Sequence, residues 1–297
     1  MVDVSVIIPT FGAPVFLGNS IQSVLFQTLT NWELFVVDDN NPDTEAREKT
    51  VKLMQSFTND CRIHYLKHPR NLNGAVARNT GLAEATGKYI AFLDSDDEYK
   101  PERLQKCFEL MEEQSSKVAA VYTGCEFRKG GNVYQVETNV KPGNYLVQTL
   151  ACTFMFCTGS NIFVRKNVVD EINGFDGKFL RHQDYEFLAR IFKKYEIEAI
   201  PEVLVIKNNE NVNLPNVKKM IDIKHQYLEK FADYIQDLSE ADQRYIYHSQ
   251  WLSVAEAAQR SKDYSTAKEY YKKATEYGGL SAKEIARRLA FRVLSMK

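Results

Sequence analysis

Long apolar runs are absent from this sequence. No stretch approaches the roughly 20 apolar residues that a membrane-spanning helix needs. The opening residues, MVDVSVIIPT, include the charged Asp3 and reach Pro9 too early for a secretory signal peptide. From these absences we expect a cytoplasmic protein without a membrane span or a secretion signal.

Paired cysteines and a surplus of charge are also missing. None of the five cysteines forms a CxxC pair, which argues against a zinc ribbon or a disulfide framework and favours a reducing compartment. The formal net charge is −1, so no overall basic field attracts nucleic acid. An anionic partner would have to bind through a local patch.

What is present is an ordinary globular composition, with 44% hydrophobic and 26% charged residues among 297. Over the first hundred residues, strand-like and helix-like segments alternate. This alternation predicts an α/β fold, with a Rossmann-like, mostly parallel central sheet flanked by helices. Strands are expected at 4–9, 33–39, 62–66 and 88–94, and helices at 20–29, capped by Ser20, and 75–85.

Polar residues follow several of these strands. In a doubly wound sheet, ligands bind beyond the carboxyl ends of the strands. Three of the four strands end in residues suited to binding, and their convergence indicates a site at that edge. These residues are Thr10-Phe11, Asp38-Asp39 and Asp94-Ser95-Asp96.

The second half of the chain has a different pattern. Between about 118 and 206 it is mixed, with strands expected at 118–124, 159–166 and 199–207 and a helix at 184–195. A polar stretch at 207–216 then indicates a linker. We therefore expect an α/β domain at 1–213 and an all-helical C-terminal domain at 214–297.

The helical domain contains one segment, 251–278, that resembles a tetratricopeptide-type helical hairpin. Such repeats usually need about three units to be stable alone. A hairpin packed on the rest of the protein, or on a second copy in a homo-oligomer, is the alternative to a peptide-binding array. The matching residues are Ala257, Tyr264, Ala267, Tyr271 and Ala274.

The last residues, KEIARRLAFRVLSMK, combine an apolar helical face with basic side chains. Such a helix can lie on an anionic membrane surface at the inner face of the membrane, where it would bring the protein to a lipid-linked partner. An ordinary terminal helix docked on the hairpin is the other interpretation.

The stretch YIAFLDSDD places Asp94, Asp96 and Asp97 directly after an apolar run. Like charges this close repel, and aspartate forms strands poorly. Asp94 and Asp96 can direct oxygens toward one hard cation such as Mg²⁺ or Mn²⁺. A capped turn, with Asp97 facing solvent near the next helix, is the alternative.

Five segments in register extend this argument. VSVIIPTF, ELFVVDDN, NGAVARNTG, YIAFLDSDDEYKPERL and RHQDYEFLAR follow one another in the order and spacing of the family 2 glycosyltransferases, which the sequence resembles over roughly residues 3–206. The resemblance implies an inverting enzyme of the GT-A fold that uses a nucleotide-sugar donor. The helical tail lies outside it.

The resemblance implies contacts to the nucleotide base. Phe11, next to Thr10, stands where the family places an aromatic ring against the base, although a core aromatic is the competing interpretation. Asp39 matches the acidic residue that accepts a hydrogen bond from the N–H of uracil. An acceptor-only carboxylate favours a base with an imide N–H, such as uracil or thymine.

The resemblance also implies contacts to the diphosphate. Arg78 matches the family's arginine, and a guanidinium there can balance phosphate charge. A surface arginine paired with Glu84 is the alternative. The neighbouring pair Asn73-Gly74 departs from the family pattern, which commonly has glycine at the first of these positions.

Further roles fall on the aspartates. Asp94 and Asp96, with Ser95 between them, match the DxD motif that holds a divalent cation against the donor, with Asp96 as the more consistent ligand. Asp184 matches the general base that inversion requires. Its neighbour is Gln183 rather than the usual glutamate, which should lessen any like-charge elevation of the pKa of Asp184. A helix-capping aspartate is the alternative.

These expectations describe a metal-dependent transferase that moves one sugar from a UDP-hexose or UDP-N-acetylhexosamine to a glycan hydroxyl, during surface polysaccharide or glycoprotein glycan assembly. The acceptor would be a glycan, free, lipid-linked or on a glycoprotein. The chain has no QxxRW, the motif of the family's processive synthases. A non-catalytic scaffold and a sugar-phosphate nucleotidyltransferase are the alternatives, although PTFGAPVF lacks the glycine-rich basic loop of the latter.

Overall fold

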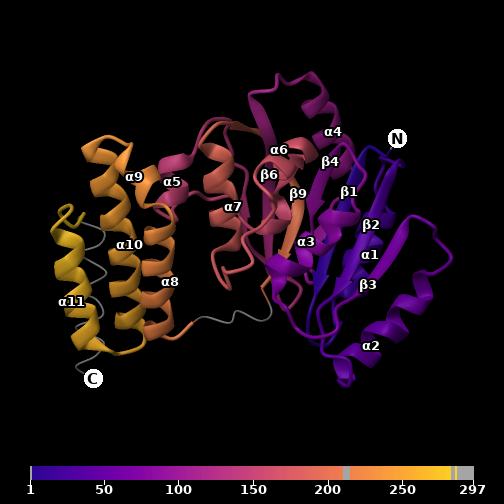
Figure 1. Ribbon diagram of the computed structural model, residues 1–297, viewed down its shortest axis with the longest axis horizontal. Helices are drawn as coiled ribbons and strands as arrows, with labels where there is room; N and C mark the ends of the chain where they lie inside the picture. Colours follow the sequence, from indigo (N-terminus) through magenta and orange to yellow (C-terminus); the bar gives the residue numbers. More distant parts are fainter. Residues whose placement is uncertain (1, 210–214, 282–284, 286–297) are drawn as a thin grey trace. The chain divides into compact units, whose positions relative to one another are not determined.

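The computed structural model describes residues 2–209, 215–281 and 285 (Figure 1). The chain forms two compact units, which we call the α/β unit (Met1–Asn144 with Met155–Val212) and the helical unit (Tyr145–Phe154 with Asn213–Lys297). The chain therefore enters the helical unit twice. The sequence predicts residues 145–154 in the α/β domain, whereas the structure has them in the helical unit. The boundary predicted near residue 213 lies outside the described residues.

The α/β unit is built on a single mixed sheet (Figure 1). In the described part of the chain this sheet has nine strands in the order β3-β2-β1-β4-β8-β6-β9-β5, with β7 paired to β6. The strands are β1 (Val4–Thr10), β2 (Trp32–Asp38), β3 (Ile63–Lys67), β4 (Tyr89–Phe92), β5 (Glu98–Tyr99), β6 (Val118–Lys129), β7 (Asn132–Glu137), β8 (Phe163–Arg165) and β9 (Glu196–Asn208).

The first four strands in space, β3, β2, β1 and β4, are parallel to one another. β8 runs antiparallel to both β4 and β6, and β6 is parallel to β9. The sheet is therefore parallel where helices and strands alternate along the chain, and mixed where that alternation ends. This is the division that the sequence pattern predicts.

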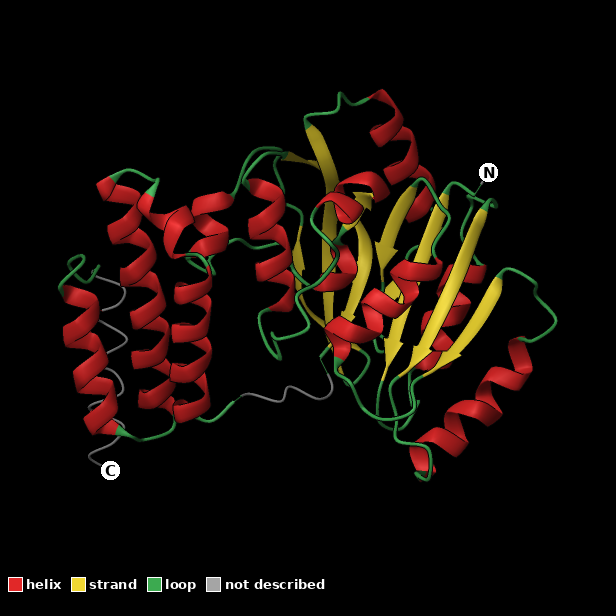
Figure 2. Cartoon of the chain, viewed as in Figure 1, coloured by secondary structure: helices red, strands yellow, loops and turns green. Residues whose placement is uncertain are grey.

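Helices cover both faces of the sheet, and β1 shows the division (Figure 2). Val4, Val6 and Ile8 pack in one core with α1 (Leu17–Leu25) and α4 (Arg103–Glu113). Ile7 points the other way, toward α3 (Gly74–Glu84), where a Cβ on Gly81 would lie 2.7 Å from its side chain. The other helices of this unit are α2 (Glu45–Met54), α6 (Lys166–Glu171) and α7 (Gln183–Phe192), with short 3₁₀ turns η1 (Gln55–Phe57) and η2 (Gly159–Asn161).

The helical unit consists of α5 (Leu146–Leu150), α8 (Val217–Lys230), α9 (Ala232–Gln236), α10 (Glu240–Arg260) and α11 (Tyr264–Thr275). α10 and α11 pack as a hairpin, with the Tyr271 hydroxyl donating to Gln259 Oε1 at 2.5 Å (Figure 1). Side chains of later helices hold α5, because Tyr227 donates to the Thr149 carbonyl at 3.0 Å and Gln250 to that of Leu150 at 2.6 Å.

The basic amphipathic helix predicted at 283–297 lies outside the described residues, apart from Ile285. Within the described ranges, the helices are too short or too polar to span a lipid bilayer.

Two elements differ from the sequence prediction. α1 begins at Leu17, and Ser20 is buried inside it rather than capping it. The strand predicted at 159–166 is instead the turn η2 followed by the short β8. Asn161 explains the second difference, because its side chain donates to the carbonyl of Thr123 at 2.6 Å and so competes with a regular strand ladder.

Candidate active site

The carboxyl ends of β1, β2 and β4 meet along one edge of the sheet. Thr10 pairs with Asp38 in the register of β1 and β2, and Leu93 N donates to the Ile7 carbonyl at 3.0 Å. The polar residues predicted to converge after these strands therefore do so. We call this edge the carboxyl edge.

Phe11 is an exposed aromatic ring at the carboxyl edge. It is 64% exposed, so it is not the core aromatic that was the competing interpretation. The backbone beside it is fixed, because Gly12 N donates to Asn40 Oδ1 at 2.7 Å. An exposed ring on a fixed backbone leaves a face free for a planar ligand.

Asp39 is buried and its carboxylate is fully engaged. Oδ1 binds His68 Nδ1 and accepts from Leu72 N, both at 2.7 Å. Oδ2 accepts from Asn71 Nδ2 and Asn73 N, both at 2.9 Å. Asp39 thus fixes the 71–73 loop, and a contact from it to a base would require one of these hydrogen bonds to be exchanged.

Asn73 caps the start of α3. Its φ of 82° and ψ of 162° lie in a region that glycine adopts readily and other residues adopt only with strain. The Asn73 side chain accepts from Ala75 N at 2.9 Å and donates to the Gly177 carbonyl at 3.1 Å. The departure from glycine at this position therefore strains the backbone, and the two side-chain hydrogen bonds offset that strain.

Arg78, on α3, joins three parts of the site. One guanidinium nitrogen binds Asp94 Oδ1 at 2.6 Å, and another donates to Gln183 Oε1 at 3.0 Å. Arg78 is buried, and it pairs with Asp94 rather than with Glu84. Burial acts to lower the pKa of this guanidinium, but the charges of Asp94 and Asp184 raise it above its ordinary value.

Asp97 is fully buried, contrary to the interpretation in which it faces solvent. It accepts hydrogen bonds from Ser160 Oγ at 2.6 Å and Thr158 Oγ1 at 3.0 Å, and Asn208 N donates to it at 3.2 Å. Lys207 Nζ lies 3.7 Å from the same carboxylate. Buried carboxylates need such partners, so Asp97 anchors the turn after β4.

The acidic residues differ in pKa. Burial alone would raise the pKa of Asp94, but Arg78 and Lys207 outweigh it and hold this pKa below its ordinary value. Burial, followed by the charge of Asp94, raises the pKa of Asp96. Burial also raises the pKa of Asp97 to about 7. Repulsion from neighbouring carboxylates therefore contributes to the raised pKa values of Asp96 and Asp97.

A divalent cation would relieve this repulsion. Asp96 remains partly exposed at the carboxyl edge, whereas Asp94 is already paired with Arg78. In the described residues, no three carboxylate, imidazole or thiol groups form a ready-made cage. A Mg²⁺-type site needs only one or two carboxylates when water and phosphate complete the coordination, so the donor set fits.

Asp184 is the second residue of α7 and does not cap it, because His182 is the N-cap residue. Its Oδ1 is buried without a hydrogen-bond partner in the described part of the chain. Burial raises the pKa of Asp184; the Arg78 charge opposes this rise, and the Asp94 charge adds to it. A buried carboxylate with an unpaired oxygen can accept a proton from a bound hydroxyl.

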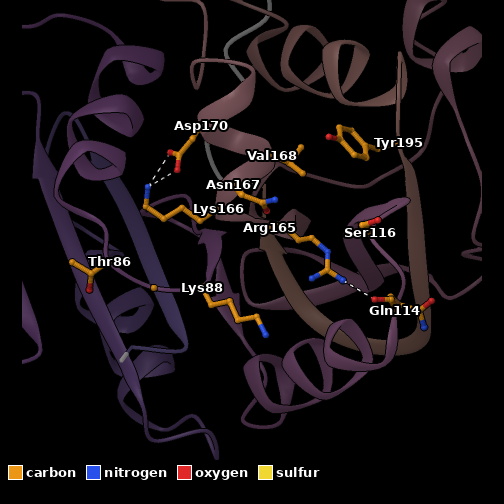
Figure 3. Close-up of a pocket in the computed structure, with 11 residues that line it drawn as sticks. Thr86, Lys88, Gln114, Ser116, Arg165, Lys166, Asn167, Val168, Asp170 and Tyr195 are labelled. Carbon is orange, nitrogen blue, oxygen red and sulfur yellow. Dashed lines mark hydrogen bonds and ion pairs between the residues drawn. The ribbon is translucent and has the colours of Figure 1, made fainter.

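A cavity of about 650 Å³ lies at the opposite, amino end of β4, where Tyr89 pairs with Arg165 (Figure 3). Its cations are already engaged. Lys166 Nζ lies 2.8 Å from Asp170, and Arg165 donates to the Gln114 carbonyl at 3.0 Å. We therefore assign the functional site to the carboxyl edge.

The sequence analysis missed Lys207 and Thr158. Lys207 lies near the end of β9, where a charged residue follows an apolar run, which is the same signal that identified Asp94. Thr158 carries no comparable signal. Its hydrogen bond to Asp97, 61 residues away, depends on the packing of η2.

The comparison with protein families gives a match to the family described as Glycosyl transferase family 2, over residues 5–173. A curated relative, the Escherichia coli UDP-Glc:alpha-D-GlcNAc-diphosphoundecaprenol beta-1,3-glucosyltransferase WfgD, is 31% identical over 199 residues. That alignment covers 66% of this chain and 72% of the relative.

Two solved structures have a similar fold. S. aureus TarS 1–349 in complex with UDP-GlcNAc aligns with a TM-score of 0.64 and 13% identity, covering 94% of this chain and 93% of that one. The mannosyltransferase PcManGT of Pyrobaculum calidifontis, in complex with GDP-Man and Mn²⁺, aligns with a TM-score of 0.59 and 19% identity, covering 99% and 80%.

Proposed function

Because the chain belongs to the family 2 glycosyltransferases, we propose that it transfers one sugar from a UDP-sugar to a glycan hydroxyl, with inversion at the anomeric carbon. The observation that carries this proposal is the link from Asp94 through Arg78 to Gln183, next to Asp184. It brings the aspartates proposed to bind the cation and the aspartate proposed to accept the proton to one edge of the sheet. Single displacement needs both in one place.

On the donor side, Phe11 would stack on the base, with Thr10 beside it. The choice of UDP follows from the Escherichia coli relative and from the TarS complex, both of which name a uridine nucleotide. Arg78 and the amino end of α3, after Asn73 and Gly74, would face the diphosphate. Lys207, already beside the acidic cluster, would add a second cation there.

Asp96, with Asp94 and Ser95 beside it, would hold Mn²⁺ or Mg²⁺. When bound there, the cation would neutralise charge on the diphosphate and so make the nucleoside diphosphate a better leaving group. The protein's own contribution is to hold Asp94 in its ionised form through Arg78 and Lys207. It also keeps Asp97 buried, whereas Asp94 and Asp96 remain partly exposed.

On the acceptor side, Asp184 would remove the proton from the attacking hydroxyl. Since the bond forms as the proton leaves, the base must lie on the side of the sugar opposite the departing diphosphate. For a donor with an α-linked hexose, the product linkage is then β. We propose a sugar on a lipid diphosphate as the acceptor, during surface polysaccharide assembly, because that is the acceptor class of the relative.

The test begins with isothermal titration of UDP into the full chain, with and without Mn²⁺, beside an Asp96→Ala variant. We expect binding that needs the metal and is lost in the variant. The second step incubates UDP-glucose and UDP-N-acetylglucosamine with a synthetic N-acetylglucosaminyl diphosphate lipid and measures UDP release. Asp184→Asn should bind added UDP normally but form no UDP from either donor sugar.

The outcomes separate the alternatives. Binding of GDP or dTDP in place of UDP would overturn the choice of donor but keep the reaction class. No nucleotide binding in any condition would overturn the transferase proposal and favour the scaffold. Transfer that continues unchanged in Asp184→Asn would remove the assigned base.

A further inference from the structure

One short turn contacts Asp94, Asp97 and Asp184. Residues 158–161, with sequence Thr-Gly-Ser-Asn, form η2 and its N-cap, and we call them the TGSN turn. Ser160 Oγ accepts from Asp94 N at 2.9 Å and donates to Asp97 at 2.6 Å. Through Ser160, the turn is therefore hydrogen-bonded to both ends of the Asp94–Asp97 segment.

The same turn meets Asp184 at Gly159. A Cβ built on Gly159 would lie 2.7 Å from Asp184 Oδ1, 3.0 Å from its Cγ and 3.1 Å from Oδ2. Real Cβ atoms essentially never approach other atoms within 3.0 Å. The carboxylate of Asp184 thus occupies space that any side chain at position 159 would fill.

The TGSN turn cannot easily retreat from such a side chain. Arg103 is fully buried beneath it and donates to the Ser160 carbonyl at 3.2 Å and to Asn161 Oδ1 at 3.1 Å. Asn161 in turn holds the Thr123 carbonyl on β6. Displacing the turn would leave these buried polar groups unpaired, whereas rotating the short Asp184 side chain breaks no hydrogen bond at its unpaired Oδ1.

We propose that Gly159 is a positioning residue. Because it has no side chain, it leaves the space in which the Asp184 carboxylate lies, and so fixes the position of that carboxylate relative to Asp94 and Asp96. The inference rests on the proposed function, in which Asp184 is the base. Through the TGSN turn, the base and the cation-binding pair are supported by one buried element, so their spacing is set by the fold.

The first test is Gly159→Ala. Gly159 does not lie in the left-handed region, so alanine fits the backbone and the cost comes from the contact with Asp184. Since a displacement of about 1 Å at a reacting group can cost about 100-fold in rate, we expect kcat to fall by about that factor. The KM for the donor and the affinity for UDP with Mn²⁺ should not change.

Gly18→Ala is the matched control. A Cβ at that position would lie 3.7 Å from Leu53, which is ordinary van der Waals distance. It lies on α1, away from the TGSN turn, and should leave kcat unchanged. A purely structural effect of Gly159→Ala would lower the fraction of protein that binds UDP, and the titration measures that fraction directly.

The second test is a double-mutant cycle with Asp184→Ala, read by melting temperature. In the natural chain, Gly159→Ala should lower Tm by several degrees. In the Asp184→Ala background the carboxylate is gone, the methyl group has room, and the loss should disappear. This readout needs no substrate and no catalytic activity.

Equal Tm losses in both backgrounds would overturn the inference, because position 159 would then not act through Asp184. A Gly159→Ala enzyme with unchanged kcat would overturn it too. Absence of transferase activity in the natural chain would instead count against the proposed function. The coupling between the two substitutions in Tm would still show that Gly159 and Asp184 are in contact.

Discussion

Asp184 combines burial, a raised pKa and an unpaired oxygen, and each of these opposes the stability of the fold. We therefore predict that Asp184→Asn, which removes the charge and keeps the shape, stabilises the protein by about 1 kcal/mol at pH 8. The gain should shrink toward pH 5, where the natural carboxyl is increasingly protonated. Urea unfolding at the two pH values measures it, and a variant less stable than the natural chain at pH 8 would contradict it.

Asp97 gives a second prediction at this scale. Burial, and then its acidic neighbours, raises its pKa from 3.8 to about 7, although Lys207 opposes the rise. Between these values the folded state binds more protons than the unfolded chain. The metal-free protein should therefore lose stability as pH rises from about 4 to 7.

The measurement is the unfolding free energy of the metal-free protein at pH 5 and pH 8, beside Asp97→Asn. The variant should have a smaller difference between the two pH values. An identical difference in both proteins would show that other groups cause the pH dependence.

The sequence predicts the position of some residues in the candidate site and not of others. The grouping of Arg78, Asp94, Asp96 and Asp184 follows from strand ends and motif spacing. The burial of Asp97 does not, because it depends on Ser160 and Thr158, which pack from distant segments. The sequence also shows no sign that His68 and the 71–73 loop together occupy the Asp39 carboxylate, since hydrogen-bond partners from loops leave no periodic pattern.

Among the elements, α3 depends most on one cap. Asn73 combines a positive φ with side-chain acceptance from Ala75 N. Asn73→Ala removes the cap and keeps the backbone strain, so we predict a loss of about 2 kcal/mol in unfolding free energy and weaker UDP binding. Asn73→Gly relieves the strain and should lose a few tenths of a kcal/mol. Equal losses for the two variants, by urea unfolding, would contradict this account.

Element positions followed the sequence well where periodicity was strong. β1, β2, β3 and β4 begin and end within a few residues of the predicted strands. The start of α1 was wrong because Ser20 is a good capping residue, yet burial of Leu17 extends the helix past it. The sequence predicts a strand at 159–166, across most of the TGSN turn, because the apolar residues that follow the turn, Ile162 and Phe163, dominate the local pattern.

At the scale of the whole molecule, the predicted family and the GT-A fold are confirmed by the family match and by the structural neighbours. The helical unit is less separable than a terminal extension would be, because residues 145–154 belong to it. No sequence pattern marks that segment as part of the helical unit. Its assignment depends on hydrogen bonds from Tyr227 and Gln250.

This arrangement predicts the result of truncation. A fragment of residues 1–212 keeps 145–154 but removes the side chains that bind its carbonyls. Limited proteolysis with mass spectrometry should find new cleavage within 145–154 in the fragment, and protection there in the full chain. Equal protection in both would contradict the prediction.

The helical unit is assembled from two chain segments that the ribosome makes at different times. Thr149 and Leu150 leave the ribosome 78 and 100 residues before their partners Tyr227 and Gln250. At about 5–20 residues per second, that delay lasts roughly 4–20 seconds. The segment just upstream of the TGSN turn therefore reaches its final packing only once α10 has been made. A chain whose synthesis stops before α10 keeps this segment unpacked.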